Sequence, residues 1–248
     1  MLIRRGGPVL RNVKRSELLA REIVEEIISR GLEPGDFLPP EAVMLSHYEV
    51  GRASLREALR LLEAQGLVSL KPGPGGGPVL GKVDPVNLGR TATLYFRLAG
   101  ASYGLLAEAM LVLDPWLAEL AAQRSEKGHV EETLGPCMEA GDRVAGDNAG
   151  IWRVAPEFHD LVYHLSGNGV LETMASAVGA IFRAQVLSQV DMADRQSVFL
   201  ADHHRLAEAI AAGQPSKARK VAQEHMQSIV DMVTERSPGL LDRLIEWR

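Results

Sequence analysis

Residues 39–80 decide the fold of this chain, and they read PPEAVMLSHYEVGRASLREALRLLEAQGLVSLKPGPGGGPVL. Pro40 and Glu41 predict the start of a short helix, because a proline and an acidic side chain suit the first helical turn. Gly51 marks a tight turn, and a second helix is expected over 52–65. These residues therefore predict two helices joined by a short turn.

A hairpin is expected after the second helix. Gly66 ends that helix, residues 67–70 read as a short strand, and residues 79–80 return after the glycine-rich turn KPGPGGGP. An earlier helix begins near Ser16 and ends at Gly31. Three helices followed by a two-stranded hairpin predict a winged helix-turn-helix, whose last helix lies in the major groove of DNA.

The 52–65 helix has an inward face and a basic face. Apolar residues at i, i+3, i+4 and i+7 predict the inward face, which consists of Leu55, Ala58, Leu59 and Leu62. Three arginines stand four residues apart on another face: Arg52, Arg56 and Arg60. Taken alone, they fit an ordinary amphipathic helix equally well. The order of the surrounding elements favours DNA binding.

Arg52 and Arg56 are the expected base contacts, because a recognition helix presents its first turns to base edges and arginine bonds guanine at two atoms. Arg60 is expected to contact phosphate or an acidic side chain such as Glu63. Ser54 is expected to bond a phosphate or a base. The candidate contacts in the hairpin are Lys71, Gly73 and Gly75. The lysine supplies charge there, and glycines let a backbone approach closely.

The composition is that of an ordinary globular protein, with 46% hydrophobic and 24% charged residues among 248. No apolar run approaches the length of a membrane span, and the N-terminus lacks the apolar core of a secretory signal. The single cysteine, Cys137, excludes an internal disulfide framework. A cytoplasmic protein is expected.

Charge is distributed unequally along the chain. Residues 1–82 carry 12 Lys and Arg against 10 Asp and Glu, whereas the remainder carries 15 against 22. A mildly basic N-terminal part fits a polyanionic partner. Its first residues are either an arm that contacts DNA or a solvated tail. The expected parts are a basic arm at 1–15, a DNA-binding domain at 16–82, a linker at 83–90, a helical domain at 91–236 and a tail at 237–248.

From about residue 87 the pattern changes to long helices without strand signals. Helices are expected near 87–99, 103–125, 128–146, 156–166, 169–189, 195–213 and 215–236. The fold class is therefore mainly α, with an all-α bundle of six or seven helices behind the winged helix-turn-helix.

Three histidines lie on three different expected helices of this bundle: His159, His203 and His225. Imidazoles that converge in a bundle core bind Zn²⁺ or a similar divalent ion. Their spacing is no motif, so unrelated surface or core histidines remain the alternative. A metal hydrolase with three histidine ligands is a further alternative. No general base is placed for it, and Cys137 has no paired base, so no enzyme is expected.

Residues 16–80 resemble the DNA-binding domain of the GntR family of bacterial transcription regulators. The resemblance rests on LEPGDFLP at 32–39, VGRASLREAL at 50–59 and LEAQGLV at 62–68. It implies that Arg52 and Arg56 contact DNA and that the tip of the wing enters the minor groove.

Three positions depart from the family. Ala42 stands where the family usually has an arginine that helps hold DNA, and Gly51 and Ala53 replace the usual serine or threonine. Fewer polar contacts imply a weaker or altered DNA site rather than a lost function.

The C-terminal part is similar to the FCD domain of the FadR-type subgroup. The matching pieces are LAE at 106–108 through LDP at 113–115, EFH at 157–159, SGN at 166–168, EAIAAG at 208–213 and HM at 225–226. In many members an aspartate four residues before the first histidine and three histidines hold a metal. The resemblance therefore implies that His159, His203 and His225 are ligands, but the aspartate position is Ala155. Water, an effector carboxylate or a distant acid such as Asp114 is expected to complete the site.

An arginine that faces a carboxylate effector often stands in this subgroup where the chain has Met110. The pocket is therefore expected to be more apolar than usual, with Arg183 as a substitute contact for the anion. The implied effector-binding residues are Met110, Asp114, Arg183 and Asn168.

The sequence thus predicts a homodimeric transcription regulator, more a repressor than an activator, that binds an inverted-repeat operator. Its partners are double-stranded DNA and an effector, an acid with a hydrophobic part. The expected cofactor is a divalent metal, with Zn²⁺ ahead of Ni²⁺ or Mn²⁺. The alternative is a DNA-binding dimer whose bundle senses nothing.

Overall fold

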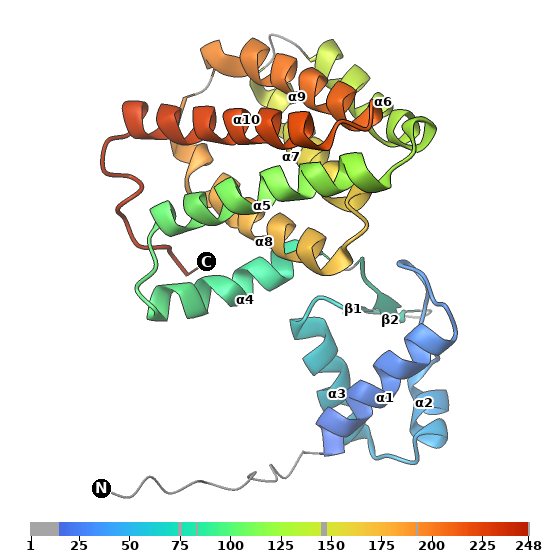
Figure 1. The fold of residues 1–248 in the computed structure, drawn as a ribbon. Helices are drawn as coiled ribbons and strands as arrows, with labels where there is room; N and C mark the ends of the chain where they lie inside the picture. The colour runs from blue at the N-terminus through green and yellow to red at the C-terminus, as the bar shows by residue number, and fades with distance from the viewer. Residues whose placement is uncertain (1–14, 74–75, 83, 145–147, 192, 248) are drawn as a thin grey trace, which may run out of the picture. The chain divides into compact units, whose positions relative to one another are not determined.

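The computed structural model describes residues 15–73, 76–82, 84–144, 148–191 and 193–247, with the backbone alone for 148–153. The chain divides into two compact units, Met1–Asp84 and Pro85–Arg248 (Figure 1). The first contains three helices and a hairpin, and the second is built from helices. The mainly α fold expected from the sequence is confirmed.

The first unit is a winged helix-turn-helix. Its elements are α1 (Arg15–Ser29), α2 (Glu41–His47), α3 (Arg52–Ala64), β1 (Val68–Lys71) and β2 (Gly77–Leu80). β1 and β2 pair antiparallel, with Val68 opposite Leu80. Phe37 forms a further antiparallel bridge to Val79, so the loop before α2 extends the small sheet.

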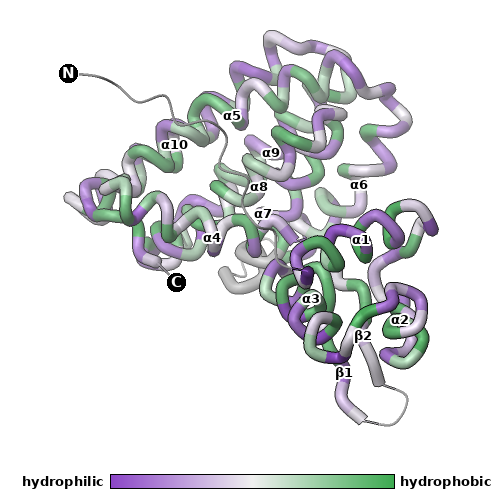
Figure 2. Tube along the Cα trace, turned by 90° about the horizontal axis from the view of Figure 1, so that it is seen from below, coloured by the Kyte–Doolittle hydropathy of each residue, from purple (hydrophilic) through white to green (hydrophobic). Residues whose placement is uncertain are grey.

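The inward face of α3 lies as the sequence predicts. Leu55, Ala58, Leu59 and Leu62 are all buried, and they join one apolar cluster with Leu19 and Ile23 of α1 and Met44 of α2. In Figure 2, hydrophobic and hydrophilic residues alternate along α1 and α3, as expected of amphipathic helices that cover a core.

The turn between α2 and α3 differs from the expectation for Gly51. Glu49 carries the left-handed backbone, with φ of 50°. Gly51 is extended and caps α3, with φ of −79° and ψ of 157°, and a Cβ added to it would have no atom within 4 Å. The tight turn therefore does not require a glycine at position 51.

The second unit is a bundle of seven α-helices and two short 3₁₀ helices in the part of the chain that the structure describes. They are α4 (Pro85–Leu98), α5 (Tyr103–Arg124), α6 (Lys127–Arg143), α7 (Asn148–Leu165), α8 (Gly169–Gln185), η1 (Leu187–Gln189), η2 (Ala193–Arg195), α9 (Gln196–Ala211) and α10 (Pro215–Arg236). α5 runs through the middle, with α10 along one side and α8 along the other, and α4 packs on α8 (Figure 1).

Two helices begin earlier than expected, and both corrections involve a proline. α7 begins at Asn148 rather than at residue 156, with Pro156 inside it, because a proline removes one helical hydrogen bond without necessarily ending a helix that packs on its neighbours. α4 begins at Pro85, within the stretch expected to be a linker. Proline suits the first position of a helix.

α4 and α8 approach closely at Gly89. A Cβ added to Gly89 would lie 3.3 Å from the carbonyl oxygen of Ala177 and 3.4 Å from Cγ1 of Ile181. Any larger side chain at this position must therefore push α4 away from α8.

The residues after α10 fold back onto the bundle. Leu240 and Ile245 are buried, and the amide of Ile245 donates to the carbonyl of Ala101 at 3.0 Å. The carboxamide of Gln185 pairs with the backbone of Glu246 through two hydrogen bonds of 2.9 Å. The tail thus closes over the end of α8 and the start of α5.

One helical stretch, Gly169–Gln189, is long and apolar enough to cross a membrane by length and composition alone. Half of this stretch is buried inside the bundle, and core helices of folded domains commonly meet the same criteria. It is therefore weak evidence for a membrane span.

Candidate functional sites

The basic face of α3 is open to solvent. Arg52, Arg56 and Arg60 are all exposed, and Ser54 is half-buried. Arg56 lies 3.6 Å from a carboxylate oxygen of Glu41, an exposed pair of little energetic value that a DNA phosphate or base can displace.

The expectation that Arg60 pairs with Glu63 is not met among the described side chains. The carboxylate of Glu63 instead accepts a hydrogen bond from the amide of Leu70 at 3.3 Å. Glu63 therefore links the end of α3 to β1 through this hydrogen bond. Arg60 is exposed.

The hairpin carries one cation and a tight glycine turn. Lys71 is exposed, and its ammonium lies 5.5 Å from the centroid of the Phe37 ring. Gly73 has left-handed backbone with φ of 98°, and its carbonyl accepts the amide of Gly76 at 2.9 Å. A Cβ on Gly76 would lie 2.2 Å from the carbonyl oxygen of Lys71, so only glycine fits there. Gly75 and the arm at 1–14 lie outside the described residues.

Glu26 of α1 contacts the C-terminal end of α2, and no pattern in the sequence indicated this role. Its carboxylate accepts hydrogen bonds from the hydroxyl of Tyr48 and from Arg30, and Nε2 of His47 lies 3.4 Å away. The hydrogen bond from Tyr48 lowers the pKa of Glu26, so its carboxylate is charged at neutral pH.

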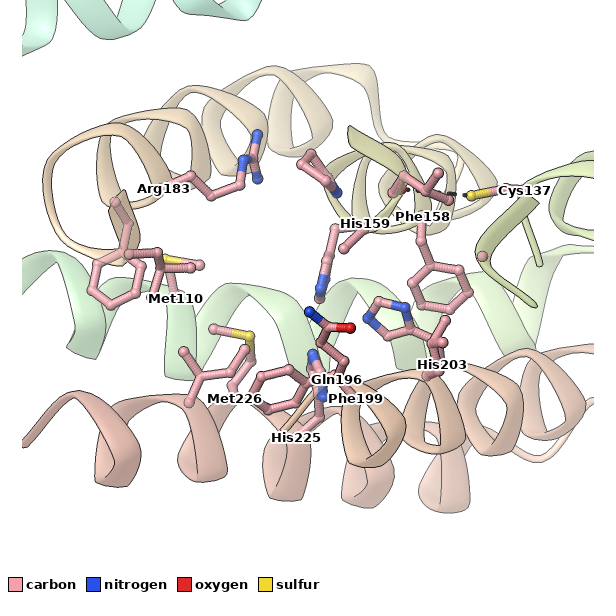
Figure 3. A pocket seen from close by; sticks show the side chains of 18 of the residues that line it. Met110, Cys137, Phe158, His159, Arg183, Gln196, Phe199, His203, His225 and Met226 are labelled. Carbon is pink, nitrogen blue, oxygen red and sulfur yellow. Dashed lines mark hydrogen bonds between the residues drawn. The ribbon is translucent and has the colours of Figure 1, made fainter. Parts of the chain in front are cut away.

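Three histidines from α7, α9 and α10 converge inside the bundle. The ring centroids of His159, His203 and His225 are 4.9–5.3 Å apart, and one nitrogen of each lies within 4.8 Å of the others. Figure 3 shows the three imidazoles pointing toward one another. The structure thus brings together residues that lie far apart in the sequence.

Two of the three histidine rings have a carboxylate at the nitrogen Nδ1. Oδ2 of Asp114 lies 3.3 Å from Nδ1 of His159, and Oδ2 of Asp202 lies 3.4 Å from Nδ1 of His225. Nε2 of His225 and Nε2 of His203 are buried without a hydrogen-bond partner. Histidine ligands of metals have this arrangement, with a carboxylate on one ring nitrogen and the metal on the other.

Burial sets the protonation of His203 and His225. Burial lowers the pKa of His203 well below its usual value of 6.5, with the neighbouring His225 adding to the effect. Burial also lowers the pKa of His225, against the opposing hydrogen bond with Asp202. Both rings are therefore neutral at pH 7, the form that binds a metal, and the residues present fit a divalent ion.

No carboxylate from α7 joins the triad. Ala155 lies one helical turn before His159, and both residues line the same cavity. Asp114 does not line the cavity; its Oδ2 contacts His159 and also accepts a hydrogen bond of 2.8 Å from Tyr163. Among the described residues, the group of possible metal ligands consists of the three histidines alone.

The cavity beside the triad has a volume of about 70 Å³. Its wall is mostly apolar and includes Met110, Phe182, Leu187, Phe199, Met226 and Ile229. Arg183 of α8 lines it and makes no ion pair with another described residue, and its guanidinium reaches toward the side of His159 (Figure 3). A cation at an apolar cavity fits an anionic ligand with a hydrophobic part.

Gln196 is a cavity residue that sequence reasoning missed. It begins α9, it is only 8% exposed, and its carboxamide has no hydrogen-bond partner among the described residues although it lines the cavity. Nothing in the sequence singles out this glutamine, because only the packing of α9 against α10, α6 and α5 directs it inward.

Two other residues have structural roles. Asn168 does not line the cavity but caps α8, where its side chain accepts the amide of Leu171 at 3.3 Å. Cys137 lines the cavity, and burial raises the pKa of its thiol to about 11, so it is protonated and a poor nucleophile at neutral pH.

Comparison with known proteins identifies both units. Residues 15–76 match the gntR family of bacterial regulatory proteins, and residues 106–228 match the FCD domain. The HTH-type transcriptional repressors NanR of Enterobacter sp. (strain 638) and Citrobacter rodentium are each 24% identical over 234 residues, covering 91% of this chain and 87% of their own.

A solved structure of Streptococcus agalactiae GntR has the same fold. It aligns with a TM-score of 0.64 and 24% identity over 86% of this chain and 98% of its own. The two matched segments together take in most of the chain. The chain belongs to the GntR family of bacterial transcription regulators and carries an FCD effector-binding domain.

Proposed function

We propose that this regulator is a homodimeric repressor whose FCD domain binds a divalent metal and a small acid, and whose DNA affinity depends on that acid. The observation that carries the proposal is the histidine triad, in which His203 and His225 are buried with unpartnered Nε2 atoms, beside a cavity lined by Arg183. A bundle that served only as a dimerisation module would need neither group.

Arg52 and Arg56 contact bases in the proposed complex, and Arg60 contacts the DNA backbone. Their exposure on α3 supports these roles, as does the position of Arg52 and Arg56 in the first two turns of the helix. Lys71 and the glycine turn at Gly73 approach the adjacent groove. A two-fold dimer reads an inverted repeat, because the symmetry of the protein is matched by that of its operator.

His159, His203 and His225 hold the metal in this proposal. Imidazole ligands favour Zn²⁺ first, with Ni²⁺ as an alternative; Mn²⁺ is the further alternative, and it would take its remaining ligands from water or the acid. When bound, the ion supplies a positive charge that attracts an acid. Asp114 and Asp202 fix the ring orientations of His159 and His225 through the contacts at Nδ1.

The effector in this proposal is a short acid with an aliphatic or cyclic part. The cavity of about 70 Å³ has room for roughly five to seven water-sized groups. Arg183 is the contact for the acid group, Gln196 offers a further hydrogen bond, and Met110 contributes to the apolar wall. Asp114 acts through His159 rather than by touching the effector.

Repression is proposed by analogy with the NanR relatives, which are named repressors. The effector must bind one state of the dimer more tightly than the other in order to change DNA affinity. The proposed place of action is the cytoplasm, where the DNA is.

Two measurements test the proposal. Genomic fragments captured by the purified protein, followed by footprinting, should yield an inverted repeat, and the genes beside it narrow the class of acid. Metal analysis of the same protein should find one divalent ion per chain. Footprints without two-fold symmetry would contradict the proposal that a dimer binds an inverted repeat. If the protein binds its operator but no metal, the metal-dependent binding of an acid proposed for the bundle is wrong.

A further inference from the structure

We propose that Glu41 is a specificity-determining residue of the DNA-binding unit, because its carboxylate competes with phosphate, but not with guanine, for the guanidinium of Arg56. The inference rests on the proposed function in one respect, since it takes Arg56 as a base contact. It adds that an acidic residue of α2, outside the helix that contacts the bases, sets how strongly the protein prefers its operator over unrelated DNA.

Glu41 and Arg56 are brought together by the packing of α2 on α3. Glu41 is the first residue of α2, and Arg56 begins the second turn of α3. Met44 of α2 and Leu55 of α3 are buried in the same apolar cluster, so the two helices keep a fixed relative position. Oε1 of Glu41 lies 3.6 Å from Nη2 of Arg56. The fold of the unit therefore places a carboxylate beside one particular arginine.

Arg56 is the one arginine of the basic face with an acidic partner among the described residues. Arg52 and Arg60 are exposed, and neither lies within ion-pair distance of a described carboxylate. The side chains of Arg56 and Glu41 are 64% and 44% exposed, so both are accessible to DNA bound by α3. An exposed pair of this kind contributes little to folding stability. Its effect is therefore expected in DNA binding.

The guanidinium of Arg56 can contact Glu41 and guanine at the same time. It carries five N–H donors in a planar fork, and a bidentate contact with O6 and N7 of guanine uses two of them. The carboxylate of Glu41 uses a third donor and restricts the directions in which the arginine side chain points. Because less side-chain freedom remains to be lost, the guanine contact forms at a lower entropic cost.

A phosphate, in contrast, is repelled by Glu41. Non-specific binding consists mainly of contacts between cationic side chains and phosphates. A phosphate within hydrogen-bonding distance of Arg56 also comes near the carboxylate, and the two negative charges repel each other. Ala42, the next residue of α2, is exposed and uncharged, so it offers no cation that would offset the repulsion. Glu41 thus disfavours phosphate contacts of Arg56 more than guanine contacts.

The experiment compares the affinities of full-length Glu41→Gln for two DNAs. One is the duplex recovered by footprinting, and the other is a shuffled duplex of the same length and base composition. Fluorescence anisotropy gives both dissociation constants at several salt concentrations. For each bound protomer, Glu41→Gln should bind the shuffled duplex about fivefold more tightly than the wild type, the effect of one unit charge near a phosphate in water.

The affinity of Glu41→Gln for the operator should change less, so the preference for the operator over the shuffled duplex falls. The salt dependence of binding to the shuffled duplex should also become steeper, by about one unit of slope for each protomer, because Arg56 gains a phosphate contact. A residue that only supported the fold would not change this slope. Thermal unfolding confirms that the variant is as stable as the wild type.

Two further variants show whether the effect passes through Arg56. Glu57→Gln is the matched control, because Glu57 is exposed and adjacent to Arg56 but has no ion-pair partner among the described residues. Neighbouring positions of a helix do not face each other, so this variant should keep the preference of the wild type. In an Arg56→Ala background, Glu41→Gln should lose most of its effect, as a double-mutant cycle reveals.

The outcomes separate this inference from the proposed function. If Arg56→Ala lowers the preference but Glu41→Gln does not, the role of Glu41 is overturned and the base contact stands. Equal effects of Glu41→Gln and Glu57→Gln, or a full effect of Glu41→Gln without Arg56, would reveal a general effect of charge and would also overturn it. If Arg56→Ala leaves the preference unchanged, the base contact itself is wrong, and the inference fails with it.

Discussion

The carboxylate of Asp114, on α5, lies 3.3 Å from Nδ1 of His159, on α7, and accepts a hydrogen bond of 2.8 Å from Tyr163. Burial and this carboxylate raise the pKa of Tyr163 well above 10, so the hydroxyl remains a donor at neutral pH. An acid on one helix thus orients the imidazole of another, although this acid does not itself line the cavity.

Replacing this acid should weaken metal binding without abolishing it. We expect Asp114→Asn to raise the dissociation constant for Zn²⁺ about 10- to 100-fold, the usual effect of losing a carboxylate behind a histidine ligand. Calorimetric titration of stripped protein measures the change. Asp160→Asn is the control, because Asp160 lies next to His159 on α7 but accepts a hydrogen bond from Ser176 instead. Equal losses in both variants would show that Asp114 has no special relation to the metal.

Removal of either of the first two arginines of α3 should reduce sequence discrimination. Arg52→Ala and Arg56→Ala are each expected to lose about 1–3 kcal/mol of preference for the operator over unrelated DNA. Arg60→Ala should weaken binding to both DNAs alike and lessen its salt dependence. Fluorescence anisotropy at several salt concentrations measures these effects. Arg21→Ala, at an exposed position of α1, serves as the control, and retained discrimination in the first two variants would contradict the assigned base contacts.

The glycines of the first unit should differ in their tolerance of alanine. Gly76→Ala forces a Cβ to within 2.2 Å of the carbonyl oxygen of Lys71, so the hairpin must rearrange at a cost of about 1–3 kcal/mol. Gly51→Ala meets no atom within 4 Å and keeps an ordinary backbone conformation. Its effect should stay within about 1 kcal/mol. Thermal unfolding of the two variants tests the contrast, and equal melting temperatures would show that the turn adapts freely.

Acid should loosen the first unit through Glu26. The pKa of Glu26 is lowered from 4.5 by the hydrogen bond from Tyr48, so its stabilising effect is fully present above 4.5 and is lost as the pH falls through the lowered value. Tyr48→Phe removes the main cause and should flatten this part of the pH dependence. Urea unfolding at a series of acidic pH values measures the difference from the wild type. An unchanged profile would assign the acid sensitivity to other carboxylates.

The winged helix-turn-helix was predictable because its signals are local. The apolar positions Leu55, Ala58, Leu59 and Leu62 repeat at helical spacing, and the structure buries all four. The residue with left-handed backbone in the turn between α2 and α3 was harder to predict. Both Glu49 and Gly51 lie in this short connection, and the structure has the left-handed conformation at Glu49. Pro156 misled the prediction because packing on neighbouring helices outweighs the loss of one hydrogen bond.

The metal site was only partly predictable. His159, His203 and His225 were singled out through the family resemblance, because their spacing alone carries no geometric information. Nothing in the sequence indicated that Asp202 contacts His225 or that Gln196 faces the cavity. These relations arise when α9 and α10 pack together, so they belong to tertiary structure rather than to any local pattern.

The close approach of α4 to α8 at Gly89 has a genetic consequence. α8 presents Arg183 to the cavity and the Ala177–Ile181 surface to α4, while α4 is the first helix after the DNA-binding unit. If the ligand controls DNA affinity as proposed, a selection for alleles that no longer respond to the ligand should recover valine or larger residues at codon 89. The purified variants should bind the operator and the ligand, each with the affinity of the wild type. Binding of the ligand should no longer lower their affinity for the operator.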